Sequence, residues 1–191
     1  GMFGKLIDNE QRIIRLFHQG KASAMDLLYA EYAGYLTSVC FRYISDDDDL
    51  KDVLQESFIK IFTRISSFTY RGKGSLKAWM TRIVINESLQ FLRHQQSAQV
   101  VRMDDNYDLP DVPEEDQNLN GISAEVLSEM IRHLPPGCRE VFNLYALEGK
   151  SHIEIAKLLN IKPDSSASQY HRARAILAKA IKKYQLNKVR E

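Results

Sequence analysis

The chain has 191 residues, of which 44% are hydrophobic, and its formal net charge is +1. These apolar residues are ample for one large or two small buried cores, so the composition predicts an ordinary soluble globular protein. No stretch approaches the roughly 20 consecutive apolar residues that a membrane-spanning helix needs. We therefore expect a cytoplasmic protein with no membrane insertion.

The small net charge hides an alternation of acidic and basic blocks. Residues 46–56 carry six acids and one base, whereas residues 64–94 carry six bases and one acid. Residues 96–122 carry seven acids and one base, and residues 168–191 carry seven bases and one acid. Two separate basic blocks favour binding to a polyanion at two places. On charge alone, solvated helix faces of alternating sign are the alternative.

The first half of the chain has the periodicity of amphipathic helices. Apolar residues at three- and four-residue steps predict helices over residues 10–18, 25–43, 50–65 and 75–94. The first helix should end at Gly20, where the chain needs a residue that tolerates positive φ. Ser75 is a candidate N-cap of the fourth helix, and Trp79 is expected in its buried stripe. We expect these helices to form one compact domain over residues 1–95.

The periodicity stops between residues 96 and 122, where acidic residues and Asn accumulate around Pro110 and Pro113. Such a segment cannot bury enough apolar surface to offset its ordering entropy, so it is predicted to be a flexible acidic linker. Helical patterns resume after it, over residues 123–134, 136–147, 151–159 and 165–184. They predict a second small domain over residues 123–191. Since no segment shows the period of two that is typical of strands, the expected fold class is all-α.

Residues 151–174 have the pattern of a helix-turn-helix, a DNA-binding motif. Asn160 tolerates the left-handed conformation where the turn must reverse. Pro163 should stop the first helix, and Asp164 or Ser165 should cap the second. The second helix would expose donors suited to base edges and phosphates, namely Ser166, Ser168, Gln169, His171, Arg172 and Arg174. An ordinary helical hairpin with a basic surface is the alternative.

Residues 66–75 form a predicted loop in which aromatic and cationic side chains are interleaved, namely Phe68, Tyr70, Arg71 and Lys73. Aromatic faces beside cations are what unstacked bases and a single-stranded backbone require. The basic surface extends onto the following helix through Lys77, Arg82 and Asn86. On local sequence alone, closure of a hydrophobic core by Phe68 and Tyr70 is at least as good an interpretation.

The residues that commonly bind metals lack the spacing of a metal site. Cys40 and Cys138 lie in apolar helical surroundings and are predicted to be buried free thiols. The five histidines are scattered without the i, i+4 spacing of a metal-binding helix. We therefore predict no metal and no cofactor.

Four segments in succession resemble the motifs of the extracytoplasmic-function sigma factors of bacterial RNA polymerase: residues 49–62, 74–86, 134–142 and 170–174. Their order and spacing match from about residue 23 to about residue 181. The resemblance implies a region two, over residues 1–95, that binds the clamp of core RNA polymerase and opens the minus-ten element of promoter DNA. It also implies a region four, over residues 123–191, that binds the polymerase flap and reads the minus-thirty-five element.

The resemblance further implies that the acidic linker over residues 96–122 threads toward the polymerase active cleft. It implies a cognate anti-sigma protein as a partner and no catalytic activity of the chain's own. Family members commonly have Glu-Gly-Thr before the recognition helix and a Lys within it. This chain has Pro163, Asp164 and Ser165, then Ala167, so a cation is absent at that end of the helix.

The resemblance assigns three sets of residues. The set expected to bind the polymerase clamp is Asp49, Asp52, Gln55, Glu56, Ile59 and Lys60. The set expected to bind the minus-ten element is Phe68, Tyr70, Arg71, Lys73, Lys77, Arg82 and Asn86. The set expected to bind the minus-thirty-five element is Ser165, Ser166, Ser168, Gln169, His171, Arg172 and Arg174.

Two other functions are compatible with parts of the pattern. A one-component helix-turn-helix regulator would bind duplex DNA without polymerase, but it would need neither the acidic helix nor the aromatic-basic loop. An enzyme could use the carboxylates of residues 46–49, but no His, Cys or Ser nucleophile and no phosphate-binding Gly loop accompanies them. Neither alternative accounts for all four motifs.

Overall fold

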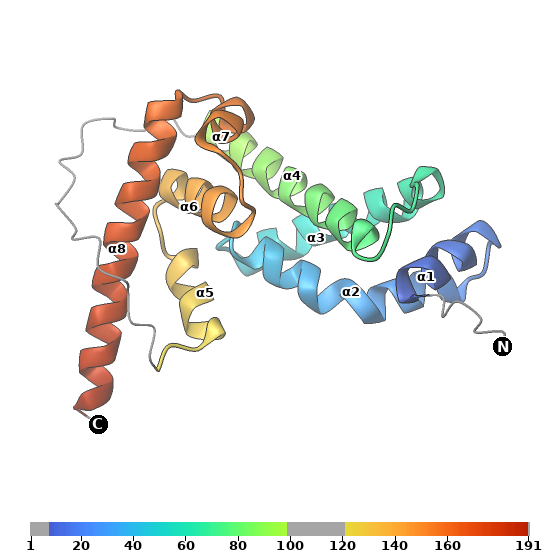
Figure 1. Cartoon of the computed structure of the whole chain (residues 1–191), viewed down its shortest axis with the longest axis horizontal. Coiled ribbons are helices and arrows are strands. Elements are labelled where there is room, and N and C mark those ends of the chain that lie inside the picture. Colours follow the sequence, from blue (N-terminus) through green and yellow to red (C-terminus); the bar gives the residue numbers. More distant parts are fainter. Residues whose placement is uncertain (1–7, 99–120, 191) are drawn as a thin grey trace, which may run out of the picture. The chain divides into compact units, whose positions relative to one another are not determined.

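The computed structural model describes residues 8–98 and 121–190, and every regular element in these ranges is a helix (Figure 1). The prediction of an all-α fold is therefore confirmed for the described part of the chain. The chain divides into two compact units, Gly1–Gln95 and Gln96–Glu191. No helix in the described ranges is both long and apolar enough to cross a membrane.

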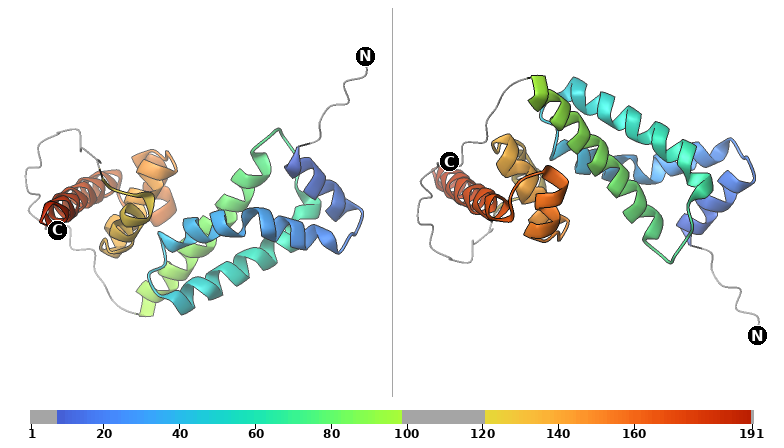
Figure 2. Two further views of the ribbon diagram at one scale, coloured as in Figure 1. Left: turned by 90° about the horizontal axis from the view of Figure 1, so that it is seen from below. Right: turned by 90° about the horizontal axis from the view of Figure 1, so that it is seen from above.

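The described part of the first unit contains α1 (Asn9–His18), α2 (Ser23–Phe41), α3 (Asp47–Arg64), the short 3-10 helix η1 (Ile65–Ser67) and most of α4 (Ser75–Ala98). Gly20 follows α1 with a φ of +66°, as the sequence predicted. Two views show α4 lying against both α2 and α3 (Figure 2). The core between them is apolar, and Leu28, Leu36, Ile61, Leu76, Met80 and Val84 are wholly inaccessible to solvent.

One helix start in this unit follows from the local sequence, and another does not. Asp46 caps α3, because its carboxylate accepts the N–H of Asp49 at 2.9 Å. Ser75, by contrast, is the first residue of α4 rather than the cap that precedes it. Its hydroxyl accepts the N–H of Arg71 in the loop at 3.1 Å. The prediction that Ser75 is the N-cap of this helix is therefore wrong.

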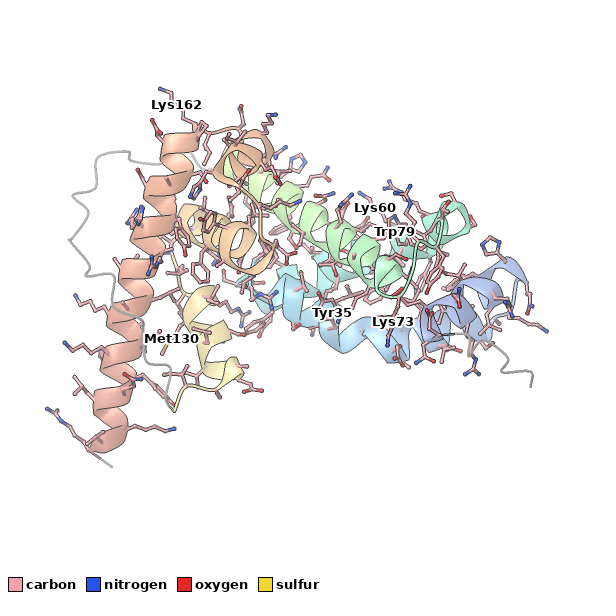
Figure 3. All side chains as sticks on the ribbon, viewed as in Figure 1. Tyr35, Lys60, Lys73, Trp79, Met130 and Lys162 are labelled. Atoms are coloured by element: carbon pink, nitrogen blue, oxygen red, sulfur yellow. The ribbon has the colours of Figure 1, made fainter. Side chains whose placement is uncertain are left out.

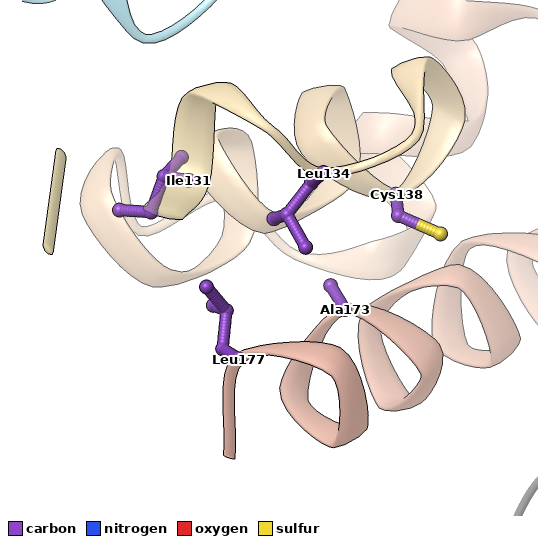
Figure 4. Packing of buried hydrophobic residues seen from close by; sticks show 5 residues of the cluster. All are labelled: Ile131, Leu134, Cys138, Ala173 and Leu177. Atoms are coloured by element: carbon purple, nitrogen blue, oxygen red, sulfur yellow. The ribbon is translucent and has the colours of Figure 1, made fainter. Parts of the chain in front are cut away.

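The second unit contains α5 (Ala124–Arg132), α6 (Pro136–Phe142), the π-helix η2 (Asn143–Leu147), α7 (His152–Leu159) and α8 (Pro163–Val189). Its core joins the end of α5 and the start of α6 to the middle of α8 (Figure 4). The buried members of this core are Ile131, Leu134, Cys138, Ala173 and Leu177. Leu127, Met130, Phe142 and Ile176 pack against it and are partly buried.

The helix-turn-helix consists of α7, a short turn and α8. Asn160 ends α7 in the left-handed conformation, with φ 55° and ψ 50°, as predicted. The N–H of Ile161 then donates to the carbonyl oxygen of Ala156 at 3.0 Å, which closes the turn. Pro163 does not only stop the first helix, because α8 begins at Pro163 itself. Proline suits the first helical position, where its missing N–H would have no partner anyway, so the predicted caps Asp164 and Ser165 are wrong.

We expect Asn160→Ala to lower the free energy of unfolding of the second unit by about 1 kcal/mol. An alanine Cβ is strained at positive φ, whereas glycine adopts this conformation freely. Asn160→Gly should therefore unfold at nearly the wild-type denaturant concentration. Denaturant titration followed by circular dichroism measures both values. If both variants lose the same free energy of unfolding, Asn160 stabilises the unit through its side-chain contacts rather than through its backbone conformation.

Both cysteines are buried free thiols, as predicted. Cys40 is inaccessible to solvent and lies 3.5 Å from the hydroxyl oxygen of Ser88. Burial raises the pKa of the Cys40 thiol to about 11. Cys138 is 1% exposed, and burial raises the pKa of its thiol as well.

Candidate nucleic-acid interface

The aromatic-basic loop connects η1 to α4, and the structure separates its two aromatic residues. Phe68 is partly buried, and its ring centroid lies 5.1 Å from that of Trp79. This contact favours the core interpretation for Phe68. Arg71 and Lys73 are exposed on either side of Gly72, and both Gly72 and Gly74 have positive φ. Lys73 is labelled in Figure 3. The loop thus presents its cations to solvent while one of its aromatic rings packs inward.

Tyr70 is bound by a residue that the sequence analysis did not single out. Its hydroxyl donates to Asp8 Oδ2, while Asp8 Oδ1 accepts the N–H of Gln11 at 2.8 Å and so caps α1. Glu10 of α1 is 6% exposed, and its carboxylate accepts two N–H groups at the start of α4. Asp8 precedes a helix, so its capping role could have been predicted. Nothing in the local pattern indicates a tyrosine 62 residues later as its partner.

The hydrogen bond between Asp8 and Tyr70 should make the stability of the folded protein depend on pH. The hydrogen bond to Asp8, with burial and the charges of Asp8 and Glu10, raises the pKa of Tyr70 from 10.0 to about 12. The stabilisation that the neutral Tyr70 hydroxyl gives to the folded state is complete below pH 10, and it is lost as pH rises through about 12. The same bond, with the nearby charge of Lys73 as a minor cause, lowers the pKa of Asp8 below 3.8. The stabilisation that the ionised Asp8 carboxylate gives to the folded state is present above pH 3.8, and it is lost as pH falls below this value.

We expect Asp8→Asn to bring the ionisation of Tyr70 down from about pH 12 toward pH 10. The near-ultraviolet absorbance of tyrosinate measures this shift, with Tyr70→Phe subtracted to isolate the one ring. An unchanged midpoint would mean that Asp8 does not hold the hydroxyl in solution.

The residues expected on α4 do not form a single face. Arg82 and Asn86 are exposed and four residues apart, so they share one side of the helix. Lys77 is turned about 140° away from Arg82, at 3.6 residues per turn. Its Nζ lies 4.0 Å from the ring centroid of Tyr35 on α2, and the Tyr35 hydroxyl lies 3.4 Å from Thr81 Oγ1. Lys77 therefore belongs to a second exposed edge, beside α2.

Two residues expected on the exposed side of the recognition helix α8 are buried, so that prediction is wrong. Ser166 is inaccessible to solvent, and its Oγ lies 2.8 Å from Nδ1 of His152 on α7. Gln169 is 8% exposed, and its Oε1 accepts a hydrogen bond from Cys138 Sγ at 2.9 Å. Both lie on the same three- and four-residue stripe as Ala173 and Leu177, which faces the core. They fasten α8 to α7 and α6.

The other expected residues of α8 are accessible. Ser168 and His171 are exposed, and Ser165, Arg172 and Arg174 are partly exposed. The Arg174 guanidinium lies 5.9 Å from the ring centroid of Tyr170. Lys162, directly before α8, is exposed and was missed (Figure 3). It supplies a cation at the end of the helix where the sequence analysis expected none.

Tyr170 of the recognition helix α8 belongs to an aromatic cluster. The rings of Tyr145 and His152 stack with centroids 4.4 Å apart and planes 7° from parallel. Tyr170 contacts both Tyr145, at 4.4 Å, and Phe142, at 6.1 Å. Tyr170 is partly buried in this cluster. The cluster therefore links α6, η2 and α7 to the recognition helix α8.

The acidic face of α3 carries the residues expected to bind polymerase. Asp52, Gln55 and Glu56 are exposed, and Ile59 is 47% exposed. Asp49 is partly buried, and it accepts a hydrogen bond from Gln95 at 3.4 Å. Burial, followed by the charge of Asp46, raises the pKa of Asp49.

Lys60, which is labelled in Figure 3, differs from the rest of this set, because it forms an ion pair with Glu87 of α4. The pair lies in an open groove of about 310 Å³ between α3 and α4, whose lining residues are Asp52, Val53, Glu56, Lys60, Glu87, Gln90, Phe91 and His94. Asp52 and Glu56 therefore stand at the edge of a recess. Among the described residues, no cluster of three or more His, Cys, Asp or Glu could hold a metal ion.

Two family models match the chain, one in each unit. The model described as Sigma-70 region 2 matches residues 28–98, and the model described as Sigma-70, region 4 matches residues 124–177. Over 183 residues the chain is 29% identical to the ECF RNA polymerase sigma-E factor of Haemophilus influenzae, which covers 90% of this chain and 95% of that protein. It is 28% identical over 185 residues to the RNA polymerase sigma-H factor of Pseudomonas aeruginosa, which covers 91% and 94%.

The fold also resembles a solved structure, that of CnrH in complex with the cytosolic domain of CnrY. The match has a TM-score of 0.50 and 21% sequence identity, and it covers 92% of this chain and 99% of that chain. At this identity the likeness concerns the fold alone.

Proposed function

The chain belongs to the sigma factors of the extracytoplasmic-function type, and we propose that it works as one through three separate surfaces. It binds core RNA polymerase and directs transcription initiation at promoters. The main support for this function is that both sigma-70 regions match the chain in the expected order. Relatives named as sigma factors also match over nearly their whole length. We propose that the chain supplies recognition and contributes no catalytic chemistry of its own.

In region two we propose one surface for polymerase and one for the minus-ten element. The exposed acids and Ile59 of α3 would meet the polymerase clamp. The exposed cations of the loop, together with Arg82 and Asn86 on α4, would meet the opened minus-ten strand. Support comes from the aromatic ring and the cations of the loop, which suit an unstacked base and its phosphates.

In region four we propose that α8 enters the major groove of the minus-thirty-five element. The residues available to it are Lys162, Ser165, Ser168, His171, Arg172 and Arg174. Ser166 and Gln169 are excluded from direct base contact because they are buried within the unit. Side chains at the start of a recognition helix are the ones that reach base edges.

Two further partners are part of the proposal. The acidic linker, most of which lies outside the described residues, would meet basic protein surfaces in the polymerase cleft. A cognate anti-sigma protein would hold the chain inactive until it is needed.

The decisive experiment adds the purified chain to bacterial core polymerase and sequences the transcripts that start on genomic DNA. We expect initiation at a defined set of promoters that core polymerase alone does not use. A one-component regulator would instead bind duplex DNA equally well without polymerase and would start no new transcripts.

We expect Arg172→Ala to flatten the salt dependence of binding to minus-thirty-five DNA. Each neutralised phosphate contributes about −0.9 to the slope of log affinity against log salt concentration. Arg172 is partly exposed on α8, so loss of one phosphate contact should change the slope by about one unit. Anisotropy titrations at several salt concentrations give this slope. If both the slope and the affinity are unaltered, Arg172 makes no contact with DNA and is only a solvated surface residue.

A further inference from the structure

The first turn of α4 is capped by a side chain from another helix. Glu10 of α1 places Oε1 2.8 Å from the backbone nitrogen of Gly74 and Oε2 2.9 Å from that of Leu76. These N–H groups have no acceptor within α4, because the first N–H groups of any helix lack one. A carboxylate satisfies them with charge-assisted hydrogen bonds, and its negative charge also suits the positive end of the helix. Glu10 is 6% exposed, so this cap is shielded from water.

The other end of the loop is held by the same helix. Asp8 accepts the Tyr70 hydroxyl with one carboxylate oxygen and the N–H of Gln11 with the other. The loop is therefore fixed to α1 at Tyr70 and again at Gly74. Only Arg71, Gly72 and Lys73 lie between these two anchors.

This short stretch is also held by two hydrogen bonds with Ser75, whose hydroxyl accepts the N–H of Arg71 at 3.1 Å and whose N–H donates to the carbonyl oxygen of Gly72 at 3.1 Å. The anchors at Tyr70 and Gly74 add to these bonds in limiting the conformations of the stretch. Gly72 has a φ of +120° and Gly74 a φ of +94°, and glycines at such positions give a chain its widest conformational freedom. With both ends fixed, Arg71 and Lys73 have less freedom to lose when they bind a ligand. Ordering before binding is what raises affinity in a preorganised site.

We propose that Asp8 and Glu10 are positioning residues for promoter opening, which preorganise the loop that receives the minus-ten strand. This role rests on the proposed function of the loop. Neither carboxylate needs to touch DNA, because Asp8 acts through Tyr70 and Glu10 acts through the backbone of Gly74 and Leu76.

The first test is made on the free protein. Glu10→Gln keeps the shape of the side chain but replaces one acceptor oxygen by an NH2 donor, so at least one of the two N–H groups loses its partner. We expect hydrogen exchange at the amides of Gly74 and Leu76 to become at least about tenfold faster, while the amides of α2 and α3 keep their rates. Asp26→Asn, the same chemical change at an exposed site on α2, should alter neither.

The second test measures promoter opening at equal polymerase occupancy. We expect Glu10→Gln to slow opening about tenfold, a loss of the size expected for a hydrogen bond to a charged group, while closed-complex affinity is unchanged. The defect should shrink on a promoter with a pre-opened, mismatched minus-ten bubble. Asp8→Asn and Tyr70→Phe should each slow opening, and the double variant should be no slower than the slower single variant, because both break one contact.

The outcomes separate this role from the proposed function. Unaltered exchange at Gly74 and Leu76, or unaltered opening by Glu10→Gln, overturns the positioning role alone. Equal losses in closed-complex affinity and in opening also overturn it, because Glu10 would then be merely structural. A wild-type chain that opens no promoter with core polymerase refutes the proposed function and this role together.

Discussion

The double variant Asp52→Lys, Glu56→Lys is expected to bind core RNA polymerase at least about a hundredfold more weakly than the wild type. The two acids are exposed one helical turn apart on α3, beside the 47% exposed side chain of Ile59. An apolar group rimmed by charges is the composition of a protein interface. Under the proposed function these acids face a positive surface of the polymerase clamp, so reversing both charges would place cations against it. Like-charge contacts cost several kcal/mol, and about 1.4 kcal/mol corresponds to a tenfold change in affinity.

Titration of labelled protein with core polymerase measures this loss, and circular dichroism must show unchanged helicity. The matched control is Asp26→Lys, Glu31→Lys, which makes the same change of net charge at two exposed acids of α2. It should bind nearly as well as the wild type. If the α3 variant binds polymerase with unchanged affinity, this face is not part of the polymerase interface. If the control loses as much affinity as the α3 variant, the loss comes from the change in net charge and not from this face.

Tyr70→Ala combined with Arg71→Ala is expected to open normal promoters about 5- to 150-fold more slowly. Stacking of one base on an aromatic ring is worth about 1–3 kcal/mol, which converts to this range at about 1.4 kcal/mol per tenfold. Phe68 is left intact because its ring packs against Trp79. Tyr70 is the other aromatic residue of the loop, and the exposed Arg71 follows it directly in the sequence.

The decisive comparison sets a normal promoter against one with a pre-opened bubble at equal polymerase occupancy. If the loop captures the strand, the defect should be smaller on the bubble, where unstacking is already complete. Tyr70→Phe is the control that separates the ring from its hydroxyl, because it keeps the stacking surface and removes only the bond to Asp8. Normal melting by the double variant would make the loop structural.

Helices and their order were predictable because burial follows the helical period. The helix expected over residues 25–43 is Ser23–Phe41, and the one expected over 50–65 is Asp47–Arg64. Asn160 was predictable too, because few residues other than glycine adopt the left-handed conformation. The helical period also places Lys77 and Arg82 on different sides of α4, so their separation needed no structure.

Contacts between distant polar residues were not predictable. Ser166 and Gln169 look like exposed recognition residues, since a polar residue in a core stripe is recognised only through its partner. Those partners, His152 and Cys138, lie 14 and 31 residues away. Glu10 reaches Leu76 across 66 residues. Local patterns describe how a segment folds but contain nothing about which backbone groups another helix will cap.

The position of the two thiols gives each unit its own chemical reporter. The thiolate is the form that reacts with alkylating agents and oxidants, and a pKa of about 11 leaves roughly one Cys40 in ten thousand ionised at neutral pH. Cys40 reports on the first unit and Cys138 on the second, because each is closed off from solvent within its own core. Modification of either one therefore has to wait for that unit to open. The rate at which each thiol is alkylated would therefore measure how often region two and region four open. Both rates could be measured in one sample, and the folded chain would need no added label.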